Sequence, residues 1–431
     1  MSGKVRIGVL GAGRGETMMK YCATADNAAL VAVCDRSEEF LARARAKLAG
    51  GDIAYYTDFE EFLRHELDAV VLANYATDHA SFAIRCLAAG KHVLSEVLPC
   101  ETLSEAVALA EAVEKSDRVY AYAENYCFMP APREMRRLYR AGKLGEFEYG
   151  EGEYFHNCES IWPSITRGEP EHWRNRIHAA YYCTHSIGPL LHITGLRPVR
   201  VTGFELPYNR RCARCGARAG LGAVEMIELE NGALIKSCHG LGIARNSVWY
   251  TVYGSLGRLE SAREDAEQGG TGRIYVNLDA REGENASKVE TYLPRDAHSD
   301  AAGSYGHDGS DYYVMWNFIE KIRGNPDAET IDVYEALDMG LPGLLAYRSI
   351  LNGGAPETVP DFRHPLAREA CRHDTACTDP VKAGDQYIPS CSRGNPIVPP
   401  ETYRRIARLW ESSARTAYGV VTESPNKSDE N

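Results

Sequence analysis

The sequence predicts an α/β protein: a doubly wound parallel sheet followed by an α+β domain with a large, mostly antiparallel open sheet. Three observations carry this prediction. A glycine turn joins a strand to a helix near the start, apolar strands alternate with amphipathic helices to residue 128, and long alternating β-rich runs follow Leu144. At 431 residues the chain is long enough for two cores. We expect domains at 1–128 and 129–365, then a C-terminal arm, a helix and a disordered tail over 366–431.

Composition and charge narrow the class of function. Hydrophobic residues make up 44% of the chain and charged residues 25%, which is ordinary for a globular protein. The formal net charge is −12 without a long basic run, so we expect neither a nucleic-acid partner nor a membrane partner. The start shows no signal-peptide pattern, and the 13 cysteines are scattered. We therefore expect a cytoplasmic protein that keeps its cysteines reduced and binds a small molecule.

The first strand and turn have the pattern of a dinucleotide site. VRIGVLGAG (5–13) is a β-branched run that ends in glycines, and a helical stretch follows it. Such a junction presents backbone N–H groups and a helix dipole to a pyrophosphate. Gly11 and Gly13 fill the first two positions of the G-x-G-x-x-G pattern. Glu16 occupies the third position, and Gly15 comes one residue early.

A second strand, ALVAVCDRS (29–37), ends in an acidic residue about 20 positions after the turn. There Asp35 would accept hydrogen bonds from the adenosine ribose and repel a 2′-phosphate, which favours NAD over NADP. Arg36 beside it weakens that preference. Further strand–helix units over 67–128 complete a Rossmann-type parallel sheet. The alternative is a flavodoxin-like domain without a nucleotide.

After Leu144 the hydrophobic period becomes two. The β-rich runs lie at 146–156, 199–206, 222–240 and 247–261. Asn231-Gly232 between two of these runs is typical of a type I′ hairpin. We expect one face of this sheet to be packed and the other to line a cleft. Helices are predicted at 187–195, 311–324 and 401–418, and an irregular segment that carries a lid at 264–308.

Together these features resemble the glucose–fructose oxidoreductase, inositol dehydrogenase and MocA family over residues 4–365. The resemblance includes Glu96 after the KHVLSE strand and His185 before a helix that ends in Thr-Gly. That family uses a lysine after the strand glutamate, an aspartate, and a histidine four residues beyond the aspartate. Only the histidine is kept here, because Val97 stands at the lysine position and Tyr181 at the aspartate position.

Three blocks are similar to one branch, glycoside hydrolase family 109 and its NAD-dependent relatives. Those enzymes have Glu-Val-Pro, Tyr-x-Thr-His-x-x-Gly-Pro and His-Gly-Gly-x-Asp. The corresponding blocks here are 96–99, 182–189 and 307–311, of which the second is the most specific. The first block carries an extra leucine. Phe128 replaces a tyrosine of that branch, although Tyr126 lies two residues earlier.

The resemblance implies a site in which NAD, tightly bound and recycled, meets a glycoside or sugar. The catalytic residues it implies are His185, Tyr182 and Glu96. Its cofactor-binding residues are Gly11, Gly13, Arg14, Gly15, Asp35, Arg36, Asn74, His79, Glu96 and Asn125. Its substrate-binding residues are Tyr126, Trp173, Arg174, Tyr181, His307 and Asp311. It also implies a homo-oligomer, a dimer or a tetramer. We expect no metal, since Cys212-x-x-Cys215 lacks a second pair.

The predicted reaction is hydrolysis without net redox change. His185 takes the proton of the C3 hydroxyl as hydride leaves the carbon. The resulting ketone acidifies the C2 proton, which Tyr182 removes if nearby positive charge lowers its pKa. Loss of the C1 group, addition of water and return of the hydride complete the cycle. The alternatives are an NAD-dependent sugar or glycoside 3-dehydrogenase and a non-catalytic NAD-binding sensor.

Each site residue also has a structural interpretation. His185 would bond the backbone at a helix start, Tyr182 would pack, and Glu96 would be a surface acid. His307 and Asp311 would cap a helix. Arg174 and Arg176 would lie in a solvated loop, which we favour over a clamp for an anionic substituent.

Overall fold

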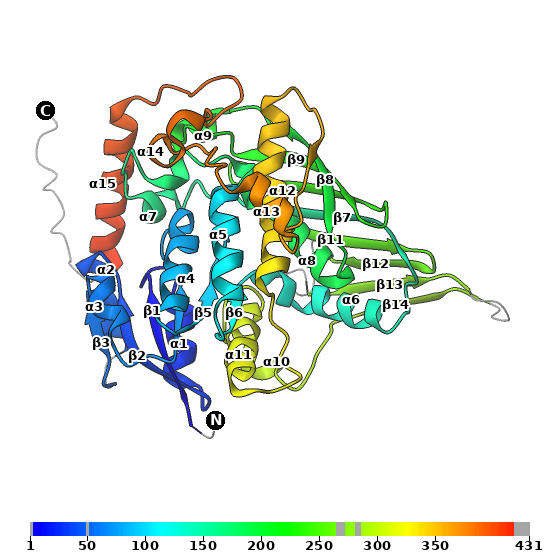
Figure 1. Ribbon diagram of the computed structural model, residues 1–431, viewed down its shortest axis with the longest axis horizontal. Helices are drawn as coiled ribbons and strands as arrows, with labels where there is room; N and C mark the ends of the chain where they lie inside the picture. Colours follow the sequence, from blue (N-terminus) through cyan, green and yellow to red (C-terminus); the bar gives the residue numbers. More distant parts are fainter. Residues whose placement is uncertain (1–2, 49–50, 264–271, 281–285, 418–431) are drawn as a thin grey trace, which may run out of the picture.

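The computed structural model describes residues 3–48, 51–263, 272–280 and 286–417 (Figure 1). In these ranges the chain forms two sheets with helices around them, and the C-terminal arm runs back over the helices of the first sheet (Figure 1). Within the same ranges, no helix combines the length and the apolar character needed to cross a membrane. The predicted disordered tail, from residue 418 onward, lies outside the described residues.

The first sheet is parallel, and its six described strands have the order β3-β2-β1-β4-β5-β6. They are β1 (Val5–Leu10), β2 (Ala28–Cys34), β3 (Ala54–Tyr56), β4 (Ala69–Leu72), β5 (His92–Ser95) and β6 (Tyr120–Tyr122). The helices between them are α1 (Glu16–Thr24), α2 (Glu38–Lys47), α3 (Phe59–Leu63), η1 (Ala76–Asp78), α4 (His79–Ala88) and α5 (Leu103–Glu114). The strand order reverses between β1 and β4, so a crevice forms at the carboxyl ends of these strands. This is the predicted doubly wound sheet.

The second sheet has nine described strands in the order β14-β13-β12-β11-β7-β10-β9-β8-β15. They are β7 (Phe147–Phe155), β8 (Pro198–Glu205), β9 (Gly222–Leu229), β10 (Leu234–Gly240), β11 (Ser247–Gly254), β12 (Gly257–Ser261), β13 (Ile274–Leu278), β14 (Lys288–Tyr292) and β15 (Glu357–Thr358). Only the central β7–β10 pair is parallel. The large, mostly antiparallel sheet is therefore confirmed.

The remaining helices include the long pair α8 and α12, which pack on the inner face of the second sheet (Figure 1). Their bounds are η2 (Asn125–Phe128), α6 (Pro130–Arg140), α7 (Trp162–Thr166), η3 (Trp173–Asn175), η4 (Ala179–Tyr182), α8 (Thr184–Thr194), α9 (Arg210–Arg214), α10 (Ser299–Ala302), α11 (Ser310–Arg323), α12 (Val333–Leu351), α13 (Pro365–Cys371), α14 (Pro380–Ala383), η5 (Gly384–Gln386) and α15 (Pro400–Ala417). Helix α8 starts three residues before the predicted start, so His185 lies in its first turn.

The prediction of an irregular segment at 264–308 is wrong for its described residues, which contain β13, β14 and α10. The segment is rich in glycine, aspartate and serine, yet it contains two short strands that pair with each other in antiparallel register. Their side chains alternate weakly because much of this edge of the sheet is exposed. Residues 264–271 and 281–285, where a lid was also expected, lie outside the described residues.

Candidate active site at the edge of the two sheets

The glycine turn after β1 has a shape that a side chain would disrupt at two positions. Gly11 has a φ of 100°, and a Cβ there would lie 2.3 Å from the carbonyl oxygen of Ala73. A Cβ on Gly15 would lie 2.4 Å from the carbonyl oxygen of Gly11. Gly15, one residue earlier than the usual pattern, is therefore the glycine that lets α1 approach the turn. A Cβ on Gly13 would make only ordinary van der Waals contact, with the Phe40 ring at 3.6 Å, so the packing of the protein alone does not require glycine there.

Asp35 is fixed at the end of β2 by two backbone N–H groups. Its carboxylate accepts hydrogen bonds from Ala12 N and Ser37 N, each at 2.8 Å. The guanidinium of Arg36 lies 4.1 Å from the centroid of the Tyr75 ring and 3.7 Å from a carboxylate oxygen of Glu169. Arg36 is therefore turned toward Tyr75 and Glu169, which weakens its role as a 2′-phosphate ligand.

Two buried polar atoms beside the turn have no hydrogen-bond partner among the described residues, Asn74 Oδ1 and His79 Nε2. His79 Nδ1 lies 3.0 Å from the carbonyl oxygen of Leu98, so Nδ1–H donates and Nε2 is left as an acceptor. Burial lowers the pKa of His79 to about 4, so the ring is neutral. Buried acceptors without partners fit the ribose hydroxyls and amide of a bound dinucleotide. Together with the glycine turn and the fixed Asp35, the residues fit NAD.

An ionic cluster joins the glycine turn to α11. Arg14 Nη2 lies 2.7 Å from Glu96 Oε1 and 3.4 Å from Asp311 Oδ1. Asp311 also accepts from Asn125 Nδ2 at 3.1 Å and pairs with His307 Nδ1 at 3.1 Å. Burial raises the pKa of Glu96, opposed by Arg14. Burial also acts to raise the pKa of Asp311, but His307 and Arg14 outweigh it and hold that pKa at about 2. Asp311 is thus an anion that holds the cluster together.

His185 is held by a fully buried carboxylate. Its Nδ1 lies 2.8 Å from Glu124 Oε1, while Thr184 Oγ1 donates to Glu124 Oε2, also at 2.8 Å. The Tyr250 hydroxyl donates to the backbone carbonyl of His185 at 2.6 Å. Because Nδ1–H donates to Glu124, Nε2 remains as the ring atom that can take a proton.

Three tyrosine rings surround His185. The ring centroids of Tyr154, Tyr126 and Tyr182 lie 4.6, 4.7 and 5.9 Å from that of His185. The buried Tyr182 hydroxyl has no hydrogen-bond partner among the described residues. Its ring stacks on Trp173 with centroids 6.3 Å apart, and the Arg174 guanidinium lies 5.1 Å from its centroid. Burial raises the pKa of Tyr182 to about 12, with Arg174 opposing. The expected lowering of this pKa is therefore wrong for the protein alone.

Comparison with known proteins agrees with this geometry. Residues 5–124 match the Gfo/Idh/MocA family, described as an oxidoreductase family with an NAD-binding Rossmann fold. Residues 224–366 match the C-terminal domain of glycosyl hydrolase 109. The first part of the chain is thus similar to an NAD-binding oxidoreductase domain, and the later part to a glycosyl hydrolase 109 C-terminal domain.

Similar proteins match most of the chain. A glycosyl hydrolase family 109 protein of Solibacter usitatus is 27% identical over 401 residues, covering 84% of this chain and 89% of that protein. One from Saccharopolyspora erythraea is 26% identical over 394 residues, covering 83% of each. Among solved structures, levoglucosan dehydrogenase in complex with NADH and L-sorbose superimposes with a TM-score of 0.68 at 16% identity, covering 84% of this chain and 100% of that one. That likeness shows the fold.

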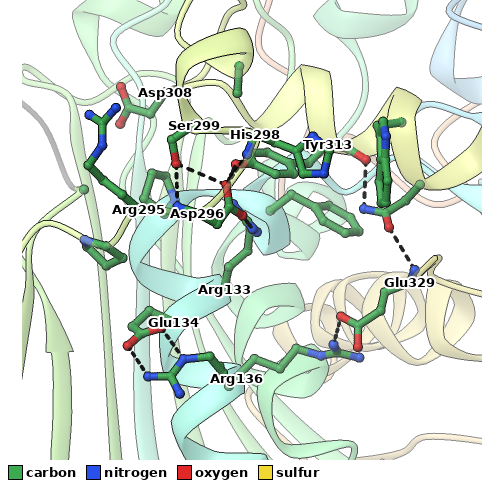
Figure 2. Close-up of a pocket in the computed structure, with 18 of the residues that line it drawn as sticks. Arg133, Glu134, Arg136, Arg295, Asp296, His298, Ser299, Asp308, Tyr313 and Glu329 are labelled. Atoms are coloured by element: carbon green, nitrogen blue, oxygen red, sulfur yellow. Dashed lines mark hydrogen bonds and ion pairs between the residues drawn. The ribbon is translucent and has the colours of Figure 1, made fainter. Parts of the chain in front are cut away.

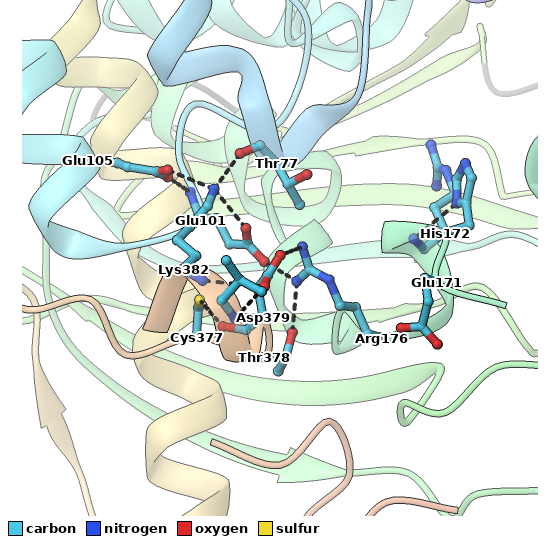
Figure 3. Close-up of polar contacts among 12 residues, drawn as sticks. Thr77, Glu101, Glu105, Glu171, His172, Arg176, Cys377, Thr378, Asp379 and Lys382 are labelled. Carbon is cyan, nitrogen blue, oxygen red and sulfur yellow. Dashed lines mark hydrogen bonds and ion pairs between the residues drawn. The ribbon is translucent and has the colours of Figure 1, made fainter. Parts of the chain in front are cut away.

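Two of the predicted positions lie outside the cluster around His185. Tyr181 is buried with its ring against Tyr347 (centroids 6.3 Å apart), so it does not face His185 as a substrate-binding residue would. Arg176 is also buried, and the solvated-loop interpretation is wrong for it. Its guanidinium pairs with Glu101 and, at 2.7 Å, with Asp379 of the C-terminal arm (Figure 3). It is therefore a structural residue and not a substrate clamp.

The structural interpretations of four other residues are also wrong. Glu96 is 5% exposed, so it is not a surface acid. The His185 side chain bonds a carboxylate and not the backbone. Neither His307 nor Asp311 caps α11, whose N-cap is Gly309 without a side-chain hydrogen bond.

Sequence reasoning missed Glu124, which holds His185. One signal was present: Glu124 follows β6 as Glu96 follows β5, and these parallel strands are neighbours, so both carboxylates reach the same edge.

A cavity of about 650 Å³ lies elsewhere, against α6 and α11 (Figure 2). Its charged groups are paired with one another, as Arg133 with Asp296 and Arg136 with Glu329 (Figure 2). None of His185, Tyr182 and Glu96 lines it.

Proposed function

We propose that the protein is an NAD-dependent glycosidase that expels an aglycone after transient oxidation at C3 of a sugar. One observation carries the proposal. His185 is oriented by the buried Glu124, its ring centroid lies 5.9 Å from that of Tyr182, whose buried hydroxyl has no partner among the described residues, and no lysine follows Glu96. The family 109 names of the relatives support a sugar-cleaving activity.

The residues that would hold NAD are the glycine turn, Asp35, and the buried acceptors of Asn74 and His79. When bound, NAD supplies a hydride acceptor at C3 and later returns that hydride, so a recycled cofactor need not leave. Asp35 would orient the adenosine ribose, and Glu96 with Arg14 would orient the nicotinamide ribose or the sugar.

His185 carries the first proton transfer. Its Nε2 takes the proton of the C3 hydroxyl, and the resulting imidazolium is stabilised by the Glu124 carboxylate 2.8 Å from Nδ1. Because Glu124 is fully buried, little solvent screens this attraction. The same Nε2 proton returns to the C3 oxygen at the end of the cycle.

Tyr182 carries the second transfer. A ketone at C3 acidifies the C2 proton, and the Tyr182 oxygen removes it so that the C1 substituent departs. Water then adds at C1 while the proton returns to C2. Trp173 and Arg174, stacked against Tyr182, hold the phenol in place and exclude solvent from it.

The raised pKa of Tyr182 favours a second candidate, an NAD-dependent sugar or glycoside 3-dehydrogenase. A phenol with a pKa of about 12 is almost entirely neutral near pH 7, so it donates hydrogen bonds and is a poor base. In a dehydrogenase, Tyr182 would only position the sugar, and the 3-keto product would be released.

A panel of α- and β-aryl glycosides and free sugars tests the two candidates, with and without added NAD⁺. Aglycone release and absorbance at about 340 nm are followed together. The glycosidase predicts many turnovers of aglycone without accumulating NADH, and solvent deuterium at C2 of the sugar. NADH that rises in step with a keto product, without aglycone release, would make the protein a dehydrogenase.

We also propose that the protein assembles as a dimer or a tetramer through the outer face of the second sheet. Exposed apolar side chains on that face are Phe204, Tyr253, Tyr275 and Val289. They lie on β8, β11, β13 and β14, across the width of the sheet. Light scattering of the purified protein tests this, and a monomer at micromolar concentration would contradict it.

A further inference from the structure

Tyr154 and His156 form a hydrogen-bonded pair at the edge of the site that the proposed reaction does not yet use. Tyr154 Oη lies 3.1 Å from His156 Nδ1, and Cys158 Sγ lies 3.5 Å from the same nitrogen. Tyr154 is buried near the end of β7, whereas His156, immediately after that strand, is half-buried. The pair therefore connects the buried tyrosine cluster with the surface.

The direction of this hydrogen bond follows from the state of its neighbours. Burial raises the pKa of Tyr154 well above its usual range, and burial raises the pKa of Cys158 to about 11, so both groups keep their protons. An O–H and an S–H thus converge on Nδ1 of His156, which accepts and leaves the ring proton on Nε2. Burial also lowers the pKa of His156, with His185, Arg174 and His307 adding to the effect, so the ring is neutral.

Among the described residues, neither the His185 ring nor the Tyr182 hydroxyl has a hydrogen bond of this kind to a half-buried histidine. His185 Nδ1 is held by the fully buried Glu124, and the Tyr182 hydroxyl has no partner among the described residues to which it can pass a proton. The Tyr154 ring centroid lies 4.6 Å from that of His185 and 5.2 Å from that of Tyr126. Burial is the largest cause of the raised pKa of Tyr154, and the Arg174 guanidinium opposes it by favouring the ionised form.

We propose that Tyr154 is a further catalytic residue of this site and that His156 exchanges its proton with solvent. In the forward direction a C–H or O–H bond of the sugar breaks and its proton passes to Tyr154 Oη. The Tyr154 O–H proton passes to His156 Nδ1, and the Nε2 proton leaves to water. The electron pair of the broken bond stays on the sugar. Each transfer reverses on the return, so no oxidant or reductant is consumed.

The inference rests on the proposed function, because it assigns a route to protons that either candidate reaction must move. It also changes the assignment within that function, since Tyr154 has a base bonded to it and Tyr182 has none among the described residues. A tyrosine with an adjacent imidazole is the better-equipped group to remove the C2 proton.

Three variants separate proton transfer from packing. Tyr154→Phe removes the hydroxyl, and His156→Ala removes the imidazole. His156→Asn keeps an acceptor oxygen near the Nδ1 position but cannot carry the proton onward. The matched control is the pair Tyr56–His65, in which the hydroxyl lies 2.9 Å from Nδ1 on the far edge of the first sheet. Tyr56→Phe and His65→Asn break an equivalent hydrogen bond outside the site.

The readouts are turnover and the rate at which solvent deuterium enters C2 of the sugar, each measured across pH, with melting curves to verify folding. Tyr154→Phe and His156→Ala are expected to lose about 100-fold or more in both rates, and added imidazole is expected to restore part of the loss in His156→Ala. His156→Asn should stay as slow as His156→Ala, while the two control variants keep the wild-type rates. If the wild type proves to be a dehydrogenase, the same losses are expected in NADH formation.

The outcomes keep the two proposals apart. A wild-type protein that neither releases aglycone nor forms NADH on any sugar overturns the proposed function, and with it the relay. An active wild type whose His156→Asn or Tyr154→Phe variant keeps the wild-type exchange rate overturns the relay alone. A test without turnover is ¹⁵N NMR of His156. The relay requires a bare Nδ1 and a protonated Nε2, and the opposite tautomer would refute it.

Discussion

Replacing Glu124 by glutamine should slow turnover while leaving the fold intact. The carboxylate is fully buried and accepts hydrogen bonds from His185 and Thr184, both at 2.8 Å. Glutamine has almost the same shape but no charge, so it no longer stabilises an imidazolium. A hydrogen bond to a charged group is worth about 1.5–3 kcal/mol, which corresponds to roughly a 10- to 150-fold loss in kcat.

The matched control for Glu124→Gln is Glu335→Gln, because the histidine that Glu335 holds lies on the same helix as His185. His192, at the other end of α8, has Nδ1 2.6 Å from Glu335 Oε1, which repeats the histidine–glutamate pair outside the tyrosine cluster. Glu335→Gln should affect the melting temperature and leave kcat within about twofold of the wild type, because His192 takes no proton from substrate. Equal kcat values for Glu124→Gln and the wild type, with both folded, would refute the role assigned to His185.

Three further predictions concern the cofactor site, acid stability and the arm. Gly13→Ala should weaken NAD binding at least about tenfold with an unchanged melting temperature, because its Cβ clashes with nothing in the protein but adds bulk to the turn that would meet the pyrophosphate. Gly11→Ala should destabilise the fold, and titration calorimetry and thermal melts measure both. Burial lowers the pKa of His79 to about 4 and of His172 to about 3. Both neutral forms are favoured by folding, so this stability is fully present above about pH 6.5 and is lost as the pH falls toward those values. Each histidine should remove about 2 kcal/mol by pH 5 in urea unfolding, and equal stability at pH 5 and 7.5 would contradict this. Arg176→Met should cost about 3–5 kcal/mol, because it leaves the buried Glu101 short of a cation; a loss below about 1 kcal/mol would show that the pair contributes little.

The fold could be predicted because its signals are local. Apolar runs, glycine turns and period-two alternation belong to neighbouring residues, and each sheet formed where the pattern indicated. Strands β13 and β14 were missed because an exposed sheet edge has little apolar alternation to detect. An alternation of apolar and polar residues marks a strand only when one of its faces is buried, and these two strands bury a face only in part.

The site was less predictable because its residues are far apart in the sequence and meet only in the folded protein. Arg14 and Asp311 are 297 positions apart, and no local pattern indicates that they meet. Tyr181 and Tyr182 are adjacent, yet the 3₁₀ turn that contains both sends only Tyr182 toward His185. The pKa of Tyr182 could not be inferred either, because the burial that raises it is a property of the packed domain.

The buried contacts of Lys382 give the C-terminal arm the role of a strap. Its ammonium group lies 2.9 Å from Glu101 and 2.7 Å from Glu105, and it donates to the carbonyl of Thr77 at 2.6 Å (Figure 3). Glu101 also binds Arg176, three residues beyond Trp173 of the site (Figure 3). The strap therefore connects the segment around Glu101, next to the first sheet, with the segment that contains Trp173 and Arg176.

Separating these segments would leave the fully buried Glu101 without Arg176 and Lys382, which costs several kcal/mol. A hinge motion that separates these segments to release a nucleotide would therefore require this free energy. The strap would make dissociation of a bound dinucleotide slow whatever its equilibrium affinity. Residence time would then be set by residues of the arm, which are remote from the glycine turn in sequence.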